Sequence, residues 1–137
     1  MFRRIPLLIA LAALPLAAAA AVATAFASSA TPALLSCSGA HLVRPAGTVV
    51  LSCADGNSLI RDTRWQSWNA AGATGTTDFG LNLCTPTCVA SRIRFFPGSA
   101  IRLVGATRTS KGLLFSRAVI RYTLNGEQRT FTAYPET

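Results

Sequence analysis

The chain has 137 residues with thirteen Arg or Lys, five Asp or Glu and one His, which gives a formal net charge of +8, and 50% of its residues are hydrophobic. A chain of this length is sufficient for one domain and too short for two of ordinary size. So few carboxylates and a single histidine offer little for general acid–base chemistry, and the composition therefore favours a non-enzymatic protein.

Residues 1–27 are predicted to be an export signal. A basic start, MFRR, is followed by an uncharged run rich in Ala and Leu from Ile5 to Ala27, and the small-residue triplet Ala25-Phe26-Ala27 ends it. Cleavage after this triplet predicts a secreted protein with a net charge of +6. The alternative is a membrane anchor formed by uncleaved residues 5–27, although Pro15 interrupts that run.

Residues 28–36, SSATPALLS, are predicted to be a flexible leader with little to bury, and residues 37–137 a single folded domain. A second alternative for localisation is a lipoprotein, because Leu34-Leu35-Ser36-Cys37 resembles a bacterial lipobox. Lipidation of Cys37 would leave three thiols, which is an awkward number in an exported protein.

The four cysteines indicate disulfides. Outside the reducing cytosol, an even number of cysteines in a short chain is typical of a disulfide framework, and four cysteines allow three pairings. Cys84 and Cys88 could form half of a zinc site, but Cys37 and Cys53 lie too far apart to supply the other half. We therefore predict no metal ion and no cofactor.

One pattern favours a particular pairing. Cys37 and Cys53 lie symmetrically about Pro45, within a turn-like stretch, Arg44-Pro45-Ala46-Gly47. A hairpin folded there would place the two cysteines opposite each other. We accordingly predict the bonds Cys37–Cys53 and Cys84–Cys88.

The rest of the chain predicts an all-β domain. Gly, Pro, Asn and Thr interrupt β-branched and aromatic runs at intervals of about ten residues, and no long helical periodicity is present. We expect about six to eight short antiparallel strands between Gly39 and Tyr134, arranged as a small disulfide-stapled sandwich or partly open barrel.

Two polar features between these runs have ordinary structural interpretations. Asp55 and Asn57 flank Gly56 in a predicted turn; with Asp62 they offer too few carboxylates for a calcium loop. His41 is the only histidine, and no nucleophile-elbow motif accompanies it, so we predict no catalytic residue.

The two tryptophans, Trp65 and Trp68, follow a strand predicted to start at Leu59. Residues three apart on a regular strand point to opposite faces, so one indole is expected inside and the other at the surface. An exposed indole would offer apolar contact area to a partner, and Trp68 is the candidate for this binding role.

Asn125-Gly126 predicts a two-residue hairpin turn between strands at residues 117–124 and 127–134. Counting outward from this turn pairs Ile120 with Phe131 and Arg121 with Thr130. One face then carries Ala118, Ile120, Tyr122, Phe131 and Ala133, and the other carries Arg117, Arg121, Thr123, Thr130 and Thr132.

Arginines recur with the same alternation in two further segments, Arg92-Ile93-Arg94-Phe95 and Ile101-Arg102-Leu103. If these strands are neighbours, their arginines form one basic surface. The candidate binding residues are Arg92, Arg94, Arg102, Arg117, Arg121 and Trp68.

The leading functional hypothesis is a secreted, non-enzymatic binding module whose arginines meet an anionic envelope polymer, lipid headgroups or an acidic protein. We expect no specific nucleic-acid partner, and the pattern leaves the oligomeric state open. The alternative is a secreted protease inhibitor that presents the loop from Asn82 to Ser91, fixed by the Cys84–Cys88 bond and Pro86.

The motifs together resemble a group of small secreted actinobacterial proteins with no assigned function, over roughly residues 37–124. The matching residues are Val43-Arg44-Pro45, Cys53 to Asn57, Trp65, Trp68, Asn82, Cys84, Pro86 and Cys88. The chain departs from that group at Gly75-Thr76-Thr77 and Val89-Ala90-Ser91. The resemblance implies export and disulfides and brings no activity or catalytic residue.

Overall fold

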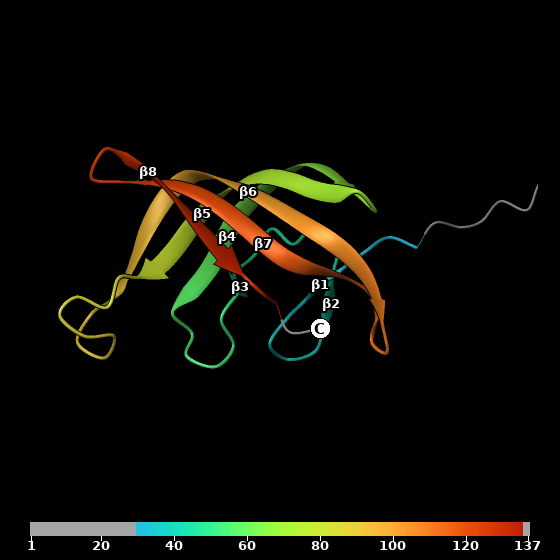
Figure 1. Ribbon diagram of the computed structural model, residues 1–137, viewed down its shortest axis with the longest axis horizontal. Coiled ribbons are helices and arrows are strands. Elements are labelled where there is room, and N and C mark those ends of the chain that lie inside the picture. The colour runs from blue at the N-terminus through green and yellow to red at the C-terminus, as the bar shows by residue number, and fades with distance from the viewer. Residues whose placement is uncertain (1–29, 136–137) are drawn as a thin grey trace, which may run out of the picture.

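A computed structural model describes residues 30–135, which form eight β-strands, and the all-β prediction is confirmed (Figure 1). Two strands pair with each other, β1 (Leu34–Leu35) and β2 (His41–Leu42). The other six form one antiparallel sheet in chain order: β3 (Val49–Val50), β4 (Ser58–Asn69), β5 (Gly72–Asn82), β6 (Ile93–Thr109), β7 (Gly112–Leu124) and β8 (Glu127–Ala133). The expected export signal, residues 1–27, lies outside the described residues. Within residues 30–135, no helix has the length and apolar character needed to cross a membrane.

Strands β4 to β7 of the large sheet are longer than the short strands we predicted; β6 alone has 17 residues. Several Gly, Pro and Asp residues that look like breaks form bulges inside strands. Asp62, with φ 50°, lies where the β4–β5 register shifts, and Gly98, with φ 69°, lies beside a shift between β5 and β6. Bulges bend and twist a sheet, and this one curls into a half-barrel (Figure 1).

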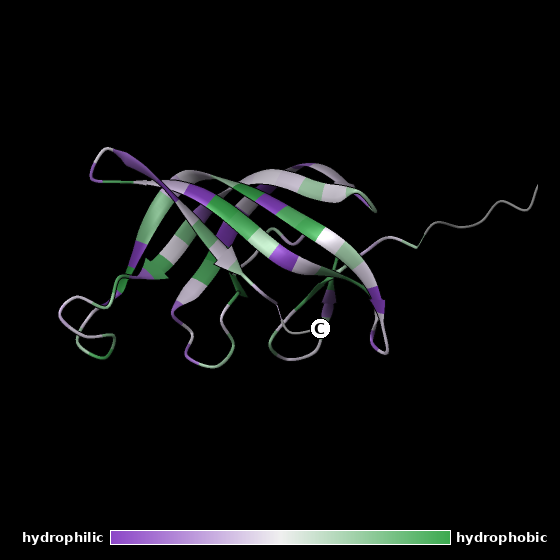
Figure 2. Ribbon diagram, viewed as in Figure 1, coloured by the Kyte–Doolittle hydropathy of each residue, from purple (hydrophilic) through white to green (hydrophobic). Residues whose placement is uncertain are grey.

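The C-terminal hairpin is confirmed in register. Ile120 pairs with Phe131 and Arg121 with Thr130, and Asn125 and Gly126 have the positive φ values of the predicted turn. The alternation also holds: Ala118, Ile120 and Ala133 are buried, whereas the arginine and threonine face is exposed. Figure 2 shows alternating hydrophobic and hydrophilic residues along β7.

The hydrophobic core lies between the inner face of the sheet and the N-terminal segment. Leu34, Val49 and Leu51 pack there against the sheet residues Ile60, Phe79, Ile101, Leu103, Phe115, Ala118 and Ile120. The prediction of a leader with little to bury is therefore wrong for its described part. Residues 32–35 are buried, and Ala33 bridges to Leu114 of β7. Leu34 packs against the core on the inner face of the sheet, and Ala33 and Leu35 form a second small cluster with Leu114.

Both predicted disulfides are present, with Cα–Cα distances of 5.4 Å for Cys37–Cys53 and 3.8 Å for Cys84–Cys88. The hairpin that led to the first pairing is wrong. β2 pairs with β1 and β3 pairs with β4, so no ladder joins the segments on either side of Pro45. Cys37 follows β1 and Cys53 follows β3, and their bond therefore ties the small sheet to the edge of the large one.

The two tryptophans lie together on the inner face, and the expectation of opposite faces is wrong. The β4–β5 register shifts between Trp65 and Ser67, which reverses the alternation between the two indoles. Their rings make an edge-to-face contact at 4.7 Å. Trp68 is 7% exposed and its Nε1 donates to the carbonyl of Pro32 at 2.8 Å, so it is a core residue and not a surface binding residue.

Replacing Gly75 by Ala is expected to destabilise the protein by about 1–3 kcal/mol, because a Cβ there would lie 2.7 Å from the carbonyl oxygen of Arg64 and 3.1 Å from the Trp65 ring. Urea unfolding measures the loss. Gly47→Ala is the control, since a Cβ at Gly47 would meet nothing within 4 Å. Equal stability of the two variants would contradict this packing.

Candidate functional site

The outer face of the sheet carries a row of paired residues that crosses five strands. Arg64 of β4 pairs with Thr76, Thr76 with Ala100, Ala100 with Arg121, and Arg121 with Thr130 of β8. Directly paired residues point to the same side of a sheet. Arg64 and Arg121 therefore share the outer face, separated by three strand spacings or about 14 Å.

Two further arginines lie on the same face beside this row. Arg102 pairs with Val119 and Arg117 pairs with Val104, so Arg102 is the diagonal neighbour of both Arg117 and Arg121. Diagonal neighbours are about 7–8 Å apart. We call these four exposed residues, Arg64, Arg102, Arg117 and Arg121, the arginine face.

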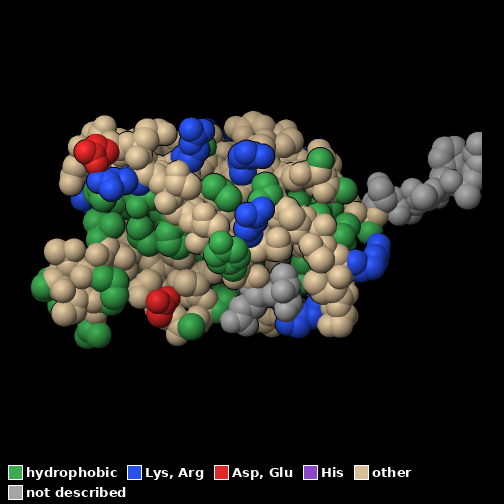
Figure 3. All heavy atoms as spheres, in the orientation of Figure 1, with side chains coloured by type: hydrophobic (Ala, Val, Ile, Leu, Met, Phe, Trp, Pro, Cys, Tyr) green, Lys and Arg blue, Asp and Glu red, His purple; other side chains and the backbone are tan. Residues whose placement is uncertain are grey.

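The arginine face has unneutralised charge. Among the described residues, none of its four side chains forms an ion pair; the pairs found there join Arg61 to Asp62 and Asp78, and Arg129 to Glu127. Figure 3 shows one view of the surface, in which Lys and Arg side chains are spread over much of the molecule and acidic ones occupy two places. Threonine side chains between the arginines, Thr74, Thr76, Thr130 and Thr132, are exposed and add hydroxyl groups.

Arg92 and Arg94 do not belong to this face, contrary to the prediction of one continuous basic surface. Arg92 precedes β6. Arg94 lies over the ring of Phe96, a core residue, at 5.4 Å, so it is on the inner side of the sheet near its end. The bulge around Pro97 and Gly98 reverses the alternation along β6, which sends Arg94 and Arg102 to opposite faces.

Arg64 is the member of the arginine face that the sequence analysis missed. Regular alternation along the strand would place Arg64 on the face opposite Arg61. The bulge at Asp62 reverses the alternation and puts both arginines on the outer face. Arg61 is not counted in the arginine face because it already has partners within the protein. Its guanidinium lies 3.5 Å from the centre of the Phe95 ring, and its Nε is 3.9 Å from Asp78.

The CADGN and NxCxPxC motifs meet in the structure. The Asn82 side-chain amide donates to Asn57 Oδ1 at 3.0 Å and to the Cys88 carbonyl at 2.8 Å, and Asn82 Oδ1 accepts from the Cys84 backbone N–H. The Asn57 backbone N–H donates to Asp55, and this bond lowers the pKa of the Asp55 carboxyl. These polar residues hold two loops together, which is a structural role.

The Cys84–Cys88 loop projects from the end of the sheet. Val89 is 99% exposed, the largest exposure among the large hydrophobic side chains that the structure describes. Residues 88–90 form a turn, in which the backbone N–H of Ser91 donates to the Thr87 carbonyl at 2.9 Å. The loop is well braced, but its tip is folded and not extended.

The described residues contain no group of three or more His, Cys, Asp or Glu side chains that could hold a metal ion. His41 is exposed on β2. The chain matches no family model, no curated protein and no solved structure. The resemblance to small secreted actinobacterial proteins therefore rests on the sequence motifs alone and stays a prediction.

Proposed function

We propose that this protein is a secreted, non-enzymatic module that binds an anionic polymer of the cell envelope through the arginine face. Two disulfides are typical of extracellular proteins and support export. The observation that carries the proposal is the set of four exposed arginines, free of ion pairs within the described residues, on one side of a hydrogen-bonded sheet.

The mechanism is Coulomb attraction combined with bidentate hydrogen bonds. A guanidinium matches the geometry of carboxylate and phosphate groups, and the sheet fixes the backbone position of each arginine. Arg102, Arg117 and Arg121 form a triangle that can meet successive anionic groups of one chain. Because the arginines are exposed, salt screens them, and binding is expected to weaken as ionic strength rises.

The test compares two double variants that change the net charge equally. Arg102→Glu/Arg117→Glu alters the arginine face, and Arg108→Glu/Lys111→Glu alters the exposed β6–β7 turn. On a polyphosphate matrix, the first variant is expected to bind about tenfold more weakly than the wild type, since two attractive contacts become repulsive. The turn variant is expected to bind nearly as the wild type does.

Two results would overturn the proposal. The first is wild-type retention that does not change between low and high salt. The second is equal weakening in the two variants, which would mean that net charge alone drives retention and that the arginine face has no special part.

The protease-inhibitor alternative receives less support. The braced loop at Cys84–Cys88 and its exposed Val89 favour it, but an extended segment is what adds to a strand edge in a peptide-binding cleft, and residues 88–90 form a turn. Loss of activity of a secreted serine protease on adding the wild type, but not the Val89→Asp variant, would favour the inhibitor.

A further inference from the structure

A cleft opens where β6 and β7 separate. The two strands pair only from Ala100 and Arg121 toward their shared turn. Before that point β6 pairs with β5 alone, and beyond it β7 pairs with β8 alone. Figure 1 shows the first half of β6 diverging from the β7–β8 hairpin. A cavity of about 310 Å³ occupies this wedge.

A hydrogen bond and a contact between aromatic rings fix the residues that line the cleft. At the bulge in β6, the Ser99 hydroxyl donates to the carbonyl of Phe96 at 2.7 Å, and Ser99 is 4% exposed. Phe96 in turn packs against Tyr122 of β7 with ring centres 4.8 Å apart. These contacts brace the two walls before any ligand arrives, which reduces the entropy lost on binding.

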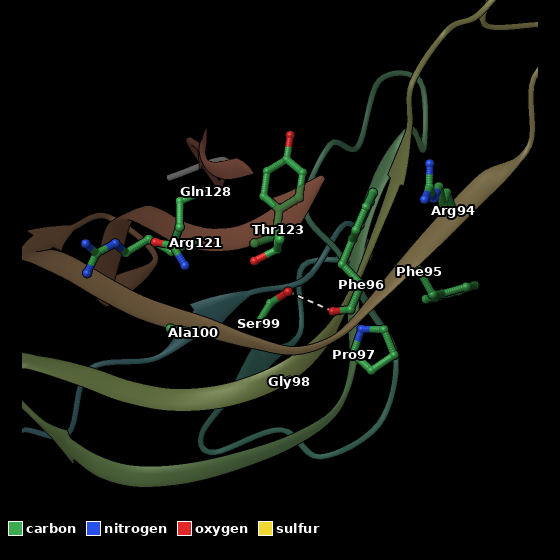
Figure 4. Close-up of a pocket in the computed structure, with 11 residues that line it drawn as sticks. Arg94, Phe95, Phe96, Pro97, Gly98, Ser99, Ala100, Arg121, Thr123 and Gln128 are labelled. Atoms are coloured by element: carbon green, nitrogen blue, oxygen red, sulfur yellow. Dashed lines mark hydrogen bonds between the residues drawn. The ribbon is translucent and has the colours of Figure 1, made fainter. Parts of the chain in front are cut away.

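The lining combines three chemistries. Arg94 and Arg121 supply positive charge and form no ion pair within the described residues. Tyr122 is partly exposed and supplies aromatic surface, whereas the Phe95 ring is covered by the Arg61 guanidinium. Thr123 and Gln128 are exposed polar residues, and Figure 4 shows them on the strands that face Ser99 and Phe96 across the gap.

We propose that this cleft binds one acidic sugar unit of the polymer that the arginine face engages. An aromatic surface packs against the apolar side of a sugar ring, hydroxyl and amide groups bond its hydroxyls, and a guanidinium binds its carboxylate or phosphate. The cavity volume is at the lower end of the range for small-ligand sites, which suits a single sugar unit.

This inference rests on the proposed function, because Arg121 belongs to both the cleft and the arginine face. It adds the chemical class of the polymer: an acidic polysaccharide.

An extended peptide fits the cleft less well. Pro97 has no N–H to offer and the bulge at Gly98 breaks the free edge of β6, so a peptide strand could not pair along it.

The test follows backbone amide resonances of the disulfide-bonded protein during titration with trigalacturonate, using maltotriose as the neutral counterpart and triglutamate as the acidic peptide. Trigalacturonate is expected to shift the amides of Ser99, Thr123 and Gln128 saturably, and the other two probes are expected to leave them in place. The Arg94→Gln/Gln128→Ala variant should bind trigalacturonate at least tenfold more weakly and keep wild-type retention on polyphosphate.

Three results would overturn the inference: equal shifts with maltotriose, shifts with triglutamate as large as those with trigalacturonate, or wild-type affinity in the cleft variant. Glucose 6-phosphate and galacturonate, titrated separately, distinguish a phosphate-bearing from a carboxylate-bearing unit. Salt-sensitive polyphosphate retention without binding of trigalacturonate, galacturonate or glucose 6-phosphate would refute the cleft alone. Trigalacturonate binding at the cleft without salt-sensitive retention would refute the role of the arginine face and leave the cleft assignment standing.

Discussion

Replacing Phe79 by Ala is expected to lower the free energy of unfolding by about 3–5 kcal/mol. Phe79 is fully buried on β5, and its ring lies 6.3 Å from Phe96, 5.2 Å from Tyr122 and 5.2 Å from Phe131. Truncation removes the central member of this cluster and leaves a cavity between strands that the backbone ladder keeps in place.

A loss of that size is a large part of the stability of a small domain, which is typically about 5–15 kcal/mol. Urea unfolding followed by tryptophan fluorescence measures it. Phe95→Ala is the matched control, because Phe95 is partly exposed on the outer face, where the Arg61 guanidinium covers its ring. We expect a smaller loss there. An equal loss in the two variants would mean that the inner face is not the main core.

The features that the sequence predicts correctly are those set by local chemistry. Asn125-Gly126 fixes the turn, the turn fixes the register, and the register assigns Ile120 to the core and Arg121 to the surface. The presence of disulfides follows from the even number of cysteines, whereas the Cys37–Cys53 pairing is correct although the hairpin from which it was predicted does not form. In each case the residues that decide the outcome are close in the chain or joined by a covalent bond.

Bulges account for most of the errors in the candidate site. A strand alternates with a period of two only while its register holds, and one extra residue sends every later side chain to the other face. The shift before Ser67 places Trp68 in the core, and the bulge at Gly98 separates Arg94 from Arg102. Gly and Asp are equally suited to turns and bulges, so neither the pattern nor the composition distinguishes the two.

The burial of residues 32–35 has a different origin. SSATPALLS has a short apolar run at residues 32–35 but no strand or helix periodicity, so the sequence does not indicate that it folds. Leu34 becomes a core residue because the curled sheet presents an open inner face, where the Trp68 indole also donates a hydrogen bond to the Pro32 carbonyl, and Ala33 and Leu35 pack against Leu114. Such a contact depends on the tertiary structure and has no local signal.

Removing the Cys37–Cys53 bond by a double Cys→Ser substitution is expected to cost about 3 kcal/mol, since the bond closes a loop of 16 residues in the unfolded chain. The structure supplies a second reason. The bond ties β1 and β2 to the edge strand β3, and Leu34 and Val49 on its two sides contribute to the core. Without the Cys37–Cys53 bond, the N-terminal segment that packs against the inner face is held only by packing and by a few hydrogen bonds.

Removing the Cys84–Cys88 bond in the same way is the matched comparison. This bond spans 4 residues, so the same loop-entropy relation gives about 2 kcal/mol, and hydrogen bonds from Asn82 still hold the loop. Thermal unfolding of both variants, and of the wild type with and without a reducing agent, checks the order. A larger loss for the Cys84–Cys88 variant would contradict it. If reduction unfolds the protein, the proposed arginine face is expected to be retained only in an oxidising compartment.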